Sequence, residues 1–332
     1  MVWCIVPALQ FLCGGGFSGR TSRPITIERY GMIPRFSYDD AFDRNLGWFT
    51  AQEQQSLKSK TIAIAGMGGV GGVHLLTLVR LGFSKFHIAD LDSFEVANFN
   101  RQVGAMMSTL DQPKVEVLAR MAKDINPEAE IQTFPDGVTP QNLDAFLDGV
   151  DLFIDGFDFF VLDIRRKTFA RCRELGISAM TAAPVGMGVA FLHFTKDGMS
   201  FEDYFRFEGQ NELRQYLNFL LGLAPSGMHR SYLVDPTRLD IGRRKAPSTM
   251  VGVELCAAYT GAQAVKYFLK RGEVKPAPFH YHFDAFLNKF EARLRPGNNG
   301  FLQRWKGNVA ERMIRKQLGM SSAELFPSAT GR

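Results

Sequence analysis

The strongest indication of the fold comes from a twelve-residue stretch, Thr61-Ile-Ala-Ile-Ala-Gly-Met-Gly-Gly-Val-Gly-Gly72. Its first five residues are apolar and suit a β-strand, its glycines suit a tight turn, and residues 73–81 have the amphipathic spacing of a helix. Glycine serves such a turn because some positions need positive φ and others must let a phosphate reach the bare backbone. The N-terminus of the following helix then offers unpaired N–H groups to an anion. The stretch therefore predicts a strand, a phosphate-binding turn and a helix.

A second apolar run, Phe86-His-Ile-Ala89, ends in Asp90, 24 residues after Gly66. In dinucleotide folds, an acidic residue at the end of the second strand holds a ribose hydroxyl. Residues 90–102 are rich in charged and amide side chains, and Lys114 follows soon after. A hydride-transfer site does not need arginine and lysine at the nucleotide phosphates, whereas a site that breaks a triphosphate must stabilise negative charge. This segment therefore favours nucleotide cleavage over a plain NAD dehydrogenase.

Taken together, these motifs resemble the E1-like adenylyltransferases, which include the ThiF, MoeB and HesA proteins and the adenylation domains of ubiquitin-activating enzymes. The resemblance rests on the glycine loop (residues 66–72), Asp90, Asn98-Phe-Asn-Arg-Gln102, Lys114 and Asp155-Gly-Phe-Asp158. The spacings from Asp90 to Arg101, Lys114 and Asp158 also match the family. The similarity covers residues 42–195 well and the remainder loosely.

The resemblance implies that ATP and a carboxylate react to give an acyl-adenylate and pyrophosphate, with ATP and Mg²⁺ as cofactors. Arg101 and Lys114 would offset charge on the phosphates. Asp158 would bind the magnesium ion, although Phe159 stands where the family usually has asparagine. The implied nucleotide-binding residues are Gly66, Gly68, Gly69, Gly71, Asp90, Asp92, Asn98, Asn100 and Gln102.

The segment Phe42-Asp-Arg44 matches a short aromatic-x-Arg element that lies at this distance before the glycine loop in the family. In relatives, its arginine reaches the nucleotide phosphates of the neighbouring subunit. The resemblance therefore implies a homodimer with shared sites and a catalytic Arg44. The alternative interpretation is an ordinary surface arginine on a helix.

For the acceptor, the resemblance favours the C-terminal glycine of a small ubiquitin-like or sulfur-carrier protein. A tRNA-modifying dehydratase is one alternative, because Gly137-Val-Thr-Pro-Gln-Asn142 resembles that branch of the family. A non-catalytic E1-like scaffold subunit is another. The net charge of +5 is compatible with an acidic partner, but the basic and acidic residues are spread along the chain, which favours solubility as its explanation.

The four cysteines, Cys4, Cys13, Cys172 and Cys256, form no Cys-x-x-Cys pair, so a structural zinc of the kind found in many relatives is not indicated. Cys172 and Cys256 lie in apolar patterns typical of structural thiols. The chain is therefore expected to adenylate its substrate without a catalytic cysteine of its own. The histidines, including one His-x-His pair, form no convincing set of metal ligands.

Alternating strand and helix patterns predict an α/β fold with a doubly wound, mostly parallel, Rossmann-like sheet, antiparallel C-terminal strands and a helical appendage. Helices are expected at 50–57, 111–126, 139–147, 161–175, 248–269 and 300–319, with aromatic helical segments at 200–225. Strands are expected at 130–134, 152–155, 177–181 and 187–194, and a strand or hairpin at 279–294. The expected segments are an N-terminal extension (1–40), a nucleotide-binding core (41–200), an acceptor-side region that completes the sheet (201–296), and a C-terminal helix and tail (297–332).

Of the 332 residues, 45% are hydrophobic and 22% are charged, as is ordinary for a globular protein. The first sixteen residues are apolar, but they lack a positive region and are too short to span a bilayer. We therefore expect a cytoplasmic protein that does not contact a membrane. The basic stretch at 241–247 is either a crossover segment above the acceptor's tail or a solvated run of charge.

Overall fold

The structure, a computed structural model, describes residues 35–238 and 245–318, the last six of them by backbone alone. The chain divides into two compact units, residues 1–36 and residues 37–332, and every element named below belongs to the second unit. Most of the predicted N-terminal extension, residues 241–244 of the basic stretch and the tail from residue 319 lie outside the described residues.

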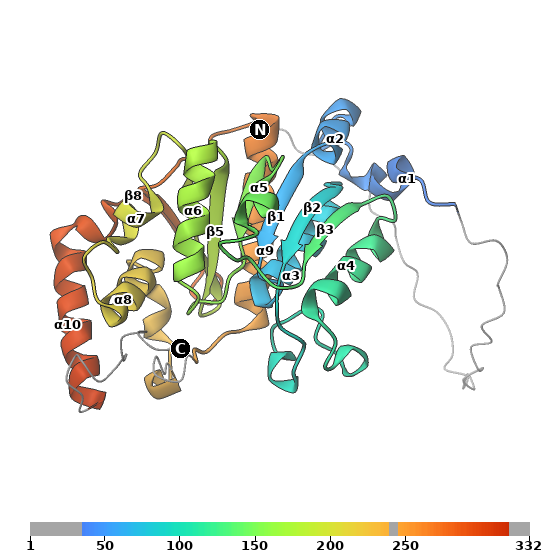
Figure 1. The fold of residues 1–332 in the computed structure, drawn as a ribbon. Helices are drawn as coiled ribbons and strands as arrows, with labels where there is room; N and C mark the ends of the chain where they lie inside the picture. The colour runs from blue at the N-terminus through green and yellow to red at the C-terminus, as the bar shows by residue number, and fades with distance from the viewer. Residues whose placement is uncertain (1–34, 239–244, 319–332) are drawn as a thin grey trace, which may run out of the picture. The chain divides into compact units, whose positions relative to one another are not determined.

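A mixed sheet of eight strands, in the order β3-β2-β1-β4-β5-β6-β7-β8, runs through this unit (Figure 1). The strands from β3 to β5 pair in parallel, and each pair from β5 to β8 is antiparallel. The sequence prediction of a doubly wound, mostly parallel sheet with antiparallel C-terminal strands is confirmed. The strands are β1 Thr61–Ala65, β2 Lys85–Ala89, β3 Glu130–Phe134, β4 Leu152–Asp155, β5 Ser178–Val185, β6 Gly188–Phe194, β7 Phe279–Asp284 and β8 Lys289–Leu294.

Helices cover both faces of the sheet, and each face has its own apolar core. Strand β1 illustrates the division, because Ile62 and Ile64 belong to one core while Ala63 and Ala65 belong to the other. Side chains that alternate along a strand point to opposite faces, so a strand that is apolar throughout must be covered on both sides. The helices are α1 Tyr38–Phe42, α2 Ala51–Lys58, α3 Gly69–Arg80, α4 Lys114–Ile125, α5 Leu143–Leu147, α6 Asp163–Leu175, α7 Phe201–Phe205, α8 Glu212–Leu223, α9 Met250–Leu269 and α10 Phe301–Leu318.

The core formed with α2, α3, α4 and α9 is largely aliphatic, whereas the core formed with α5 to α8 is rich in aromatic rings. The aromatic residues of the segment 200–225 lie in this second core, as expected; Phe169 and Phe201 stack there with ring centroids 4.0 Å apart. The C-terminal helix α10 packs on α8 through a buried arginine, Arg214, whose Nη1 lies 3.1 Å from Glu311 Oε2.

The strand order reverses between β1 and β4, since β2 and β3 lie on one side of β1 and β4 and β5 on the other. In open α/β sheets, ligands bind outside the carboxyl ends of the strands at such a switch point. The glycine loop follows β1 directly, and Gly156 follows β4. The topology therefore brings these two segments together at one edge of the sheet, and the space outside that edge is here called the crevice.

Two predicted helix starts are wrong for the same local reason, a turn that precedes the helix. The helix expected from Asp111 begins at Lys114, because Asp111 has a left-handed backbone (φ 63°). The helix expected from Thr139 begins at Leu143, because Thr139 and Asn142 each accept a hydrogen bond from the other's backbone N–H group.

Two other starts differ by a few residues. Helix α3 begins at Gly69 and not at residue 73, so the last glycines of the loop form its first turn. Helix α6 begins at Asp163 and not at residue 161. The capping box predicted at the start of α2 is confirmed, since Thr50 Oγ1 accepts from the Glu53 N–H and Glu53 Oε2 accepts from the Thr50 N–H.

Candidate nucleotide-binding site

The glycine loop joins β1 to α3 and contains two kinds of glycine. A Cβ built on Gly71 would lie 1.7 Å from the Gly66 carbonyl oxygen, and one on Gly66 would lie 2.2 Å from the Gly156 carbonyl oxygen. These glycines are required because three backbone segments touch. At Gly68 and Gly69 a Cβ would make only ordinary contacts, at 3.5 Å or more. Gln102 lies beside Gly68, and Val253 and the Arg101 carbonyl lie beside Gly69, but the backbone itself is not in tight contact at either position. These two glycines are therefore not required for packing and suit close approach of a ligand to the backbone.

Asp90 ties the glycine loop to the end of β2. Its Oδ2 accepts from the Met67 N–H at 2.5 Å and its Oδ1 from the Asp92 N–H at 2.8 Å. Burial raises the pKa of this carboxyl above its ordinary value, and the two N–H groups oppose that shift. The residue that the sequence assigned to a ribose hydroxyl therefore lies beside the loop and also fixes the shape of the loop.

Lys114 is the first residue of α4, and its side chain is almost fully buried. Its Nζ lies 3.0 Å from Asp92 Oδ2, and its backbone N–H donates to the Asp92 carbonyl oxygen at 2.9 Å. Met67, Asp90, Asp92 and Lys114 therefore form one continuous chain of contacts from the glycine loop to α4. A buried ammonium at a helix N-terminus gains nothing from the helix dipole, so its position has to be explained by what it binds.

Residues 98–102 lie against the start of α3. The side-chain amide nitrogen of Gln102 would be 3.6 Å from a Cβ on Gly68, and the Arg101 carbonyl oxygen would be 3.7 Å from one on Gly69. Gln102 is 8% exposed, and its Oε1 has no hydrogen-bond partner among the described residues. A buried polar atom without a partner is costly, so a donor on a ligand would satisfy it.

The other polar residues of this segment have partners. Asn98 is buried and accepts from the Glu95 N–H at 3.0 Å, which makes it a local cap. Asn100 donates to the Ser248 carbonyl oxygen at 3.0 Å, just before α9. Arg101 Nη1 donates to the Ala97 carbonyl oxygen and to Asn100 Oδ1, both at 2.9 Å. The structure therefore places Asp90, Gln102 and the Arg101 backbone beside the glycine loop, whereas the side chains of Asn98, Asn100 and Arg101 bind within their own segment or to Ser248.

Asp158 lies just beyond the carboxyl end of β4 and is exposed. Its Oδ1 accepts from the Phe160 N–H at 3.0 Å. Because Gly156 touches Gly66 and Gly71, the segment that carries Asp158 leaves the sheet next to the glycine loop.

The sequence placed Asp155 in the motif at the carboxyl end of its strand, where carboxylates were expected to face a ligand, and assigned no role to Arg165. In the structure Asp155 is buried and pairs with Arg165, so the two form the base of this segment. Arg165 Nε lies 3.0 Å from Asp155 Oδ2, and Thr181 Oγ1 donates to the same oxygen at 2.8 Å. A signal was present, because Arg165 shares a helical stripe with the buried residues Phe169 and Cys172. An arginine on the apolar face of a helix needs an internal partner.

Arg44 is the one predicted site residue that the structure places elsewhere. It is exposed, and its side chain makes no hydrogen bond or ion pair with any residue that the structure describes. Its neighbour Asn45 donates to the Arg80 carbonyl oxygen at 3.2 Å, at the C-terminal end of α3. The glycine loop lies at the other end of this 12-residue helix, about 18 Å away. Arg44 therefore does not meet the glycine loop of its own chain.

The two cysteines within the described residues, Cys172 and Cys256, are both fully buried. Burial raises the pKa of both thiols, because it disfavours the thiolate. Neither thiol is suited to act as a nucleophile, which agrees with the structural role predicted for them. Among the described residues, no group of three or more His, Cys, Asp or Glu side chains is arranged to hold a metal ion.

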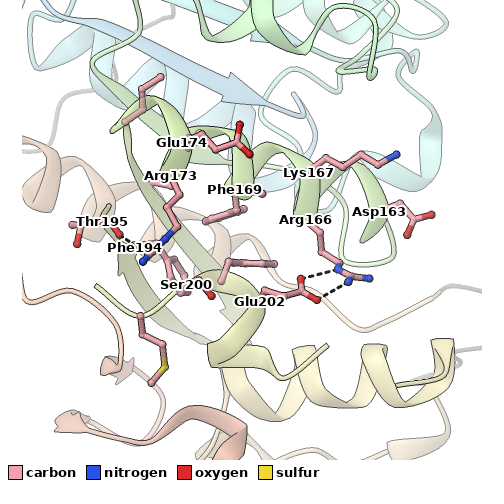
Figure 2. A pocket seen from close by; sticks show the side chains of 16 residues that line it. Asp163, Arg166, Lys167, Phe169, Arg173, Glu174, Phe194, Thr195, Ser200 and Glu202 are labelled. Atoms are coloured by element: carbon pink, nitrogen blue, oxygen red, sulfur yellow. Dashed lines mark hydrogen bonds and ion pairs between the residues drawn. The ribbon is translucent and has the colours of Figure 1, made fainter. Parts of the chain in front are cut away.

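A cavity of about 570 Å³ lies along α6 and the start of α7 (Figure 2). Phe169, Phe194 and Phe201 line its apolar part, and Arg166 closes one side through a bidentate ion pair with Glu202. None of the predicted site residues lines this cavity. It is therefore separate from the crevice between β1 and β4.

The sequence match to a known family covers most of the chain. The model of the ThiF family matches residues 42–300. The chain belongs to the ThiF family. No helix among the described residues is both long enough and apolar enough to cross a membrane.

Individual relatives match over shorter stretches. A tRNA threonylcarbamoyladenosine dehydratase of Bacillus subtilis is 35% identical over 107 residues, which is 32% of this chain and 42% of the relative. A ubiquitin-like modifier-activating enzyme 5 of Drosophila ananassae is 38% identical over 100 residues, or 29% of this chain and 24% of the relative. The chain thus spans less than half the length of these relatives.

Among solved structures, the Escherichia coli protein MccB, in a crystal with AMPCPP and MccA, superimposes with a TM-score of 0.60. The identity is 17%, and the match covers 78% of this chain and 72% of MccB. At this level of identity the similarity supports the fold.

Proposed function

We propose that this protein transfers AMP from ATP to a carboxylate and releases pyrophosphate. The observation that carries the proposal is the convergence of three elements on one crevice. These are a glycine loop at an uncapped helix N-terminus, a buried lysine at the start of α4, and an exposed aspartate beyond β4. Each supplies something that a triphosphate needs: N–H groups, a fixed positive charge, and a carboxylate for a bridging cation.

In this proposal, the glycine loop holds phosphate and Asp90 faces the ribose. Lys114 and Arg101 offset the charge that moves onto the pyrophosphate as it leaves. Asp158 fits a magnesium site, because one carboxylate together with phosphate oxygens is a usual way for proteins to bind this ion. Bound there, the ion would neutralise phosphate charge. The nucleophile is the carboxylate of the substrate itself, so the chain requires no side-chain nucleophile.

For the substrate, we favour the C-terminal glycine of a small ubiquitin-like or sulfur-carrier protein. Support comes from the partial similarity to a ubiquitin-like modifier-activating enzyme. The similarity of fold to MccB, which was crystallised with MccA, is compatible with an acceptor presented on a separate chain.

A second candidate is a carboxyl group on a modified tRNA adenosine. It is favoured by the relative named as a tRNA dehydratase and by residues 137–142, which follow β3 at the carboxyl edge of the sheet. Gly137 in this segment lies beside Leu91, since a Cβ on Gly137 would be 3.2 Å from Leu91 Cδ2. The segment is therefore close to the predicted nucleotide-binding residues.

Ligand-dependent melting tests the nucleotide part of the proposal. ATP with Mg²⁺ should raise the melting temperature, because a ligand at 100 times its Kd adds about 2.7 kcal/mol to the free energy of unfolding. NAD should leave the melting temperature unchanged. A shift with NAD and none with ATP would overturn the adenylation proposal.

ATP–pyrophosphate exchange can then distinguish between the two candidate substrates. A synthetic peptide ending in Gly-Gly should stimulate the exchange if the acceptor is a protein tail. Stimulation by threonylcarbamoyladenosine-containing tRNA, with binding that weakens steeply as salt rises, would favour the second candidate.

A further inference from the structure

The segment that carries Asp158 is folded around a buried guanidinium. Four backbone carbonyl oxygens of residues 157–161, here called the Asp158 loop, accept hydrogen bonds from Arg165 at 2.6 to 3.4 Å. These bonds use both terminal nitrogens of the guanidinium, while its Nε donates to Asp155. One side chain of the following helix therefore binds four of the loop's five carbonyl oxygens, and the fifth, that of Phe160, accepts from Tyr216 Oη on α8 at 3.0 Å.

The support extends into the sheet. Asp155 ends β4 and is 3% exposed, and its two oxygens also accept from the Phe157 N–H and from Thr181 Oγ1 on β5. The guanidinium carbon of Arg165 lies 4.7 Å from the centroid of the Phe219 ring. The arginine is thus held on one side by a carboxylate, on another by an aromatic ring, and around its fork by the loop.

Such an arrangement is a poor way to gain stability. Burying an ion pair costs desolvation energy, and well-packed apolar residues often do as well. The planar guanidinium of arginine instead fixes the positions of its acceptors, because its N–H groups point in fixed directions, unlike those of a lysine ammonium. The geometry supplied here is that of the loop that carries the exposed carboxylate of Asp158.

We propose that Arg165 is a positioning residue that sets the direction of the Asp158 carboxylate by binding the carbonyl oxygens of its loop. The part of this proposal that concerns magnesium rests on the proposed function. The part that concerns the loop does not, because it follows from contacts within the chain. Arg165 itself is 2% exposed and has all its donors occupied within the chain, so it acts through Asp158 and not on a ligand.

Arg214 provides a matched control. It is also a buried arginine with a carboxylate partner, Glu311, and its Nε donates to Asn218 Oδ1 at 3.0 Å. It joins α8 to α10 and makes no contact with the Asp158 loop. Losing it should reduce stability without altering the loop.

The first measurement is backbone hydrogen exchange of ligand-free protein, read by mass spectrometry on the peptide that covers residues 157–161. In Arg165→Met the Phe157 and Phe160 amides should exchange about tenfold faster or more, because the hydrogen bonds that hold the loop are gone. Arg165→Lys should show the same change to a smaller degree and serves if the methionine variant does not fold. Arg214→Met should leave this peptide unchanged. Wild-type exchange in a folded Arg165 variant would overturn the positioning role.

The second measurement is the ratio of the Kd of ATP without and with Mg²⁺. Arg165→Met should bring this ratio close to that of Asp158→Asn, whereas Arg214→Met should keep the wild-type ratio. If wild-type protein binds ATP with no dependence on Mg²⁺, the proposed metal role of Asp158 fails. The exchange experiment still decides in that case whether Arg165 positions the loop.

Discussion

The two ends of helix α3 differ in how their backbone groups are satisfied. At the C-terminal end, three successive carbonyl oxygens accept hydrogen bonds from side chains of the segment that contains α1 and α2. The pairs are Asn45 to Arg80, Gln54 to Leu81 and Tyr38 to Gly82, at 2.6 to 3.2 Å. At the N-terminal end, Gly68 occupies the cap, and no side chain in the part of the chain that the structure describes caps the first turn. The nearby Gln102 Oε1 is also without a partner among the described residues.

The contrast assigns the two ends of α3 to different tasks: the C-terminal end stabilises the fold, and the N-terminal end is available to a ligand. Carbonyl groups at a helix end must find partners, and the chain supplies them from α1 and α2. N–H groups at the other end are left to the crevice, where the chain also gathers Lys114 and Asp90. The C-terminal end of α3 is here called the saturated end and the N-terminal end the open end. Arg44 lies at the saturated end, so it can contact a nucleotide at the open end only if that open end belongs to a second copy of the chain. We therefore propose that the active form is a homodimer with shared sites.

The largest expected loss of activity comes from removing one cation near each end of α3, Arg44 or Lys114, each in a separate variant of the chain. Arg44→Ala and Lys114→Ala should each lower ATP–pyrophosphate exchange by about 10²-fold or more, because each removes a charge that stabilises the transition state. Mixed in equal amounts, the two variants should recover about a quarter of wild-type sites. Half of randomly formed dimers are heterodimers, and each has one intact site.

A pull-down with differently tagged subunits confirms that the subunits exchange. If exchange is confirmed and the mixture stays inactive, Arg44 does not act across an interface.

The glycines at the open end should separate packing from binding. Gly71→Ala should lower the free energy of unfolding by about 3 kcal/mol or more, because its Cβ would overlap the Gly66 carbonyl oxygen. Gly68→Ala should change stability by less than about 1 kcal/mol and should weaken ATP binding instead. Urea unfolding and ATP titration of both variants measure the two effects. Equal losses of stability in both variants would contradict the distinction.

The middle of α3 contains His74, which is 1% exposed and has no partner for either ring nitrogen within residues 35–238 and 245–312. Burial lowers the pKa of this histidine from 6.5 to about 3, so the unfolded chain takes up its proton at higher pH than the folded chain. The contribution of the neutral His74 ring to the free energy of unfolding is therefore fully present above pH 6.5 and is lost as the pH falls from 6.5 toward 3. His74→Leu should reduce the loss of stability between pH 7.5 and pH 5 by about 2 kcal/mol. The measurement is the free energy of unfolding of wild type and of His74→Leu as a function of pH. If the two curves differ only by a constant, the buried histidine does not cause the loss of stability at low pH.

The smallest effect is expected at the saturated end. Tyr38→Phe removes the donor to the Gly82 carbonyl oxygen and should lower the free energy of unfolding by about 1 kcal/mol. The Kd of ATP should stay within about twofold of wild type, since the open end is untouched. A large loss of ATP affinity in this variant would mean that the two ends are coupled.

The sequence was sufficient for a doubly wound, mostly parallel sheet with antiparallel C-terminal strands and for the segments that follow β1, β2 and β4. Glycine spacing and apolar runs are local signals, and the carboxyl ends of parallel strands meet at one edge. It was not sufficient for the role of Arg165, whose partners are carbonyl oxygens that no residue type reveals. Nor could it show that Gly71 is needed for backbone packing while Gly68 is not, because that distinction depends on how β4 lies beside β1. The helix starts at Lys114 and Leu143 were missed because left-handed and reciprocal turns precede them.

The N-terminal end of α3 is the proposed binding site for the nucleotide. Photolabelling with 8-azido-ATP in the presence of Mg²⁺, followed by peptide mapping, locates the bound nucleotide. We expect label on peptides that contain residues 66–80, 90–102 or 157–161, and competition by ATP. Label confined to the cavity along α6 and α7, or to the segment of α1 and α2, would contradict it.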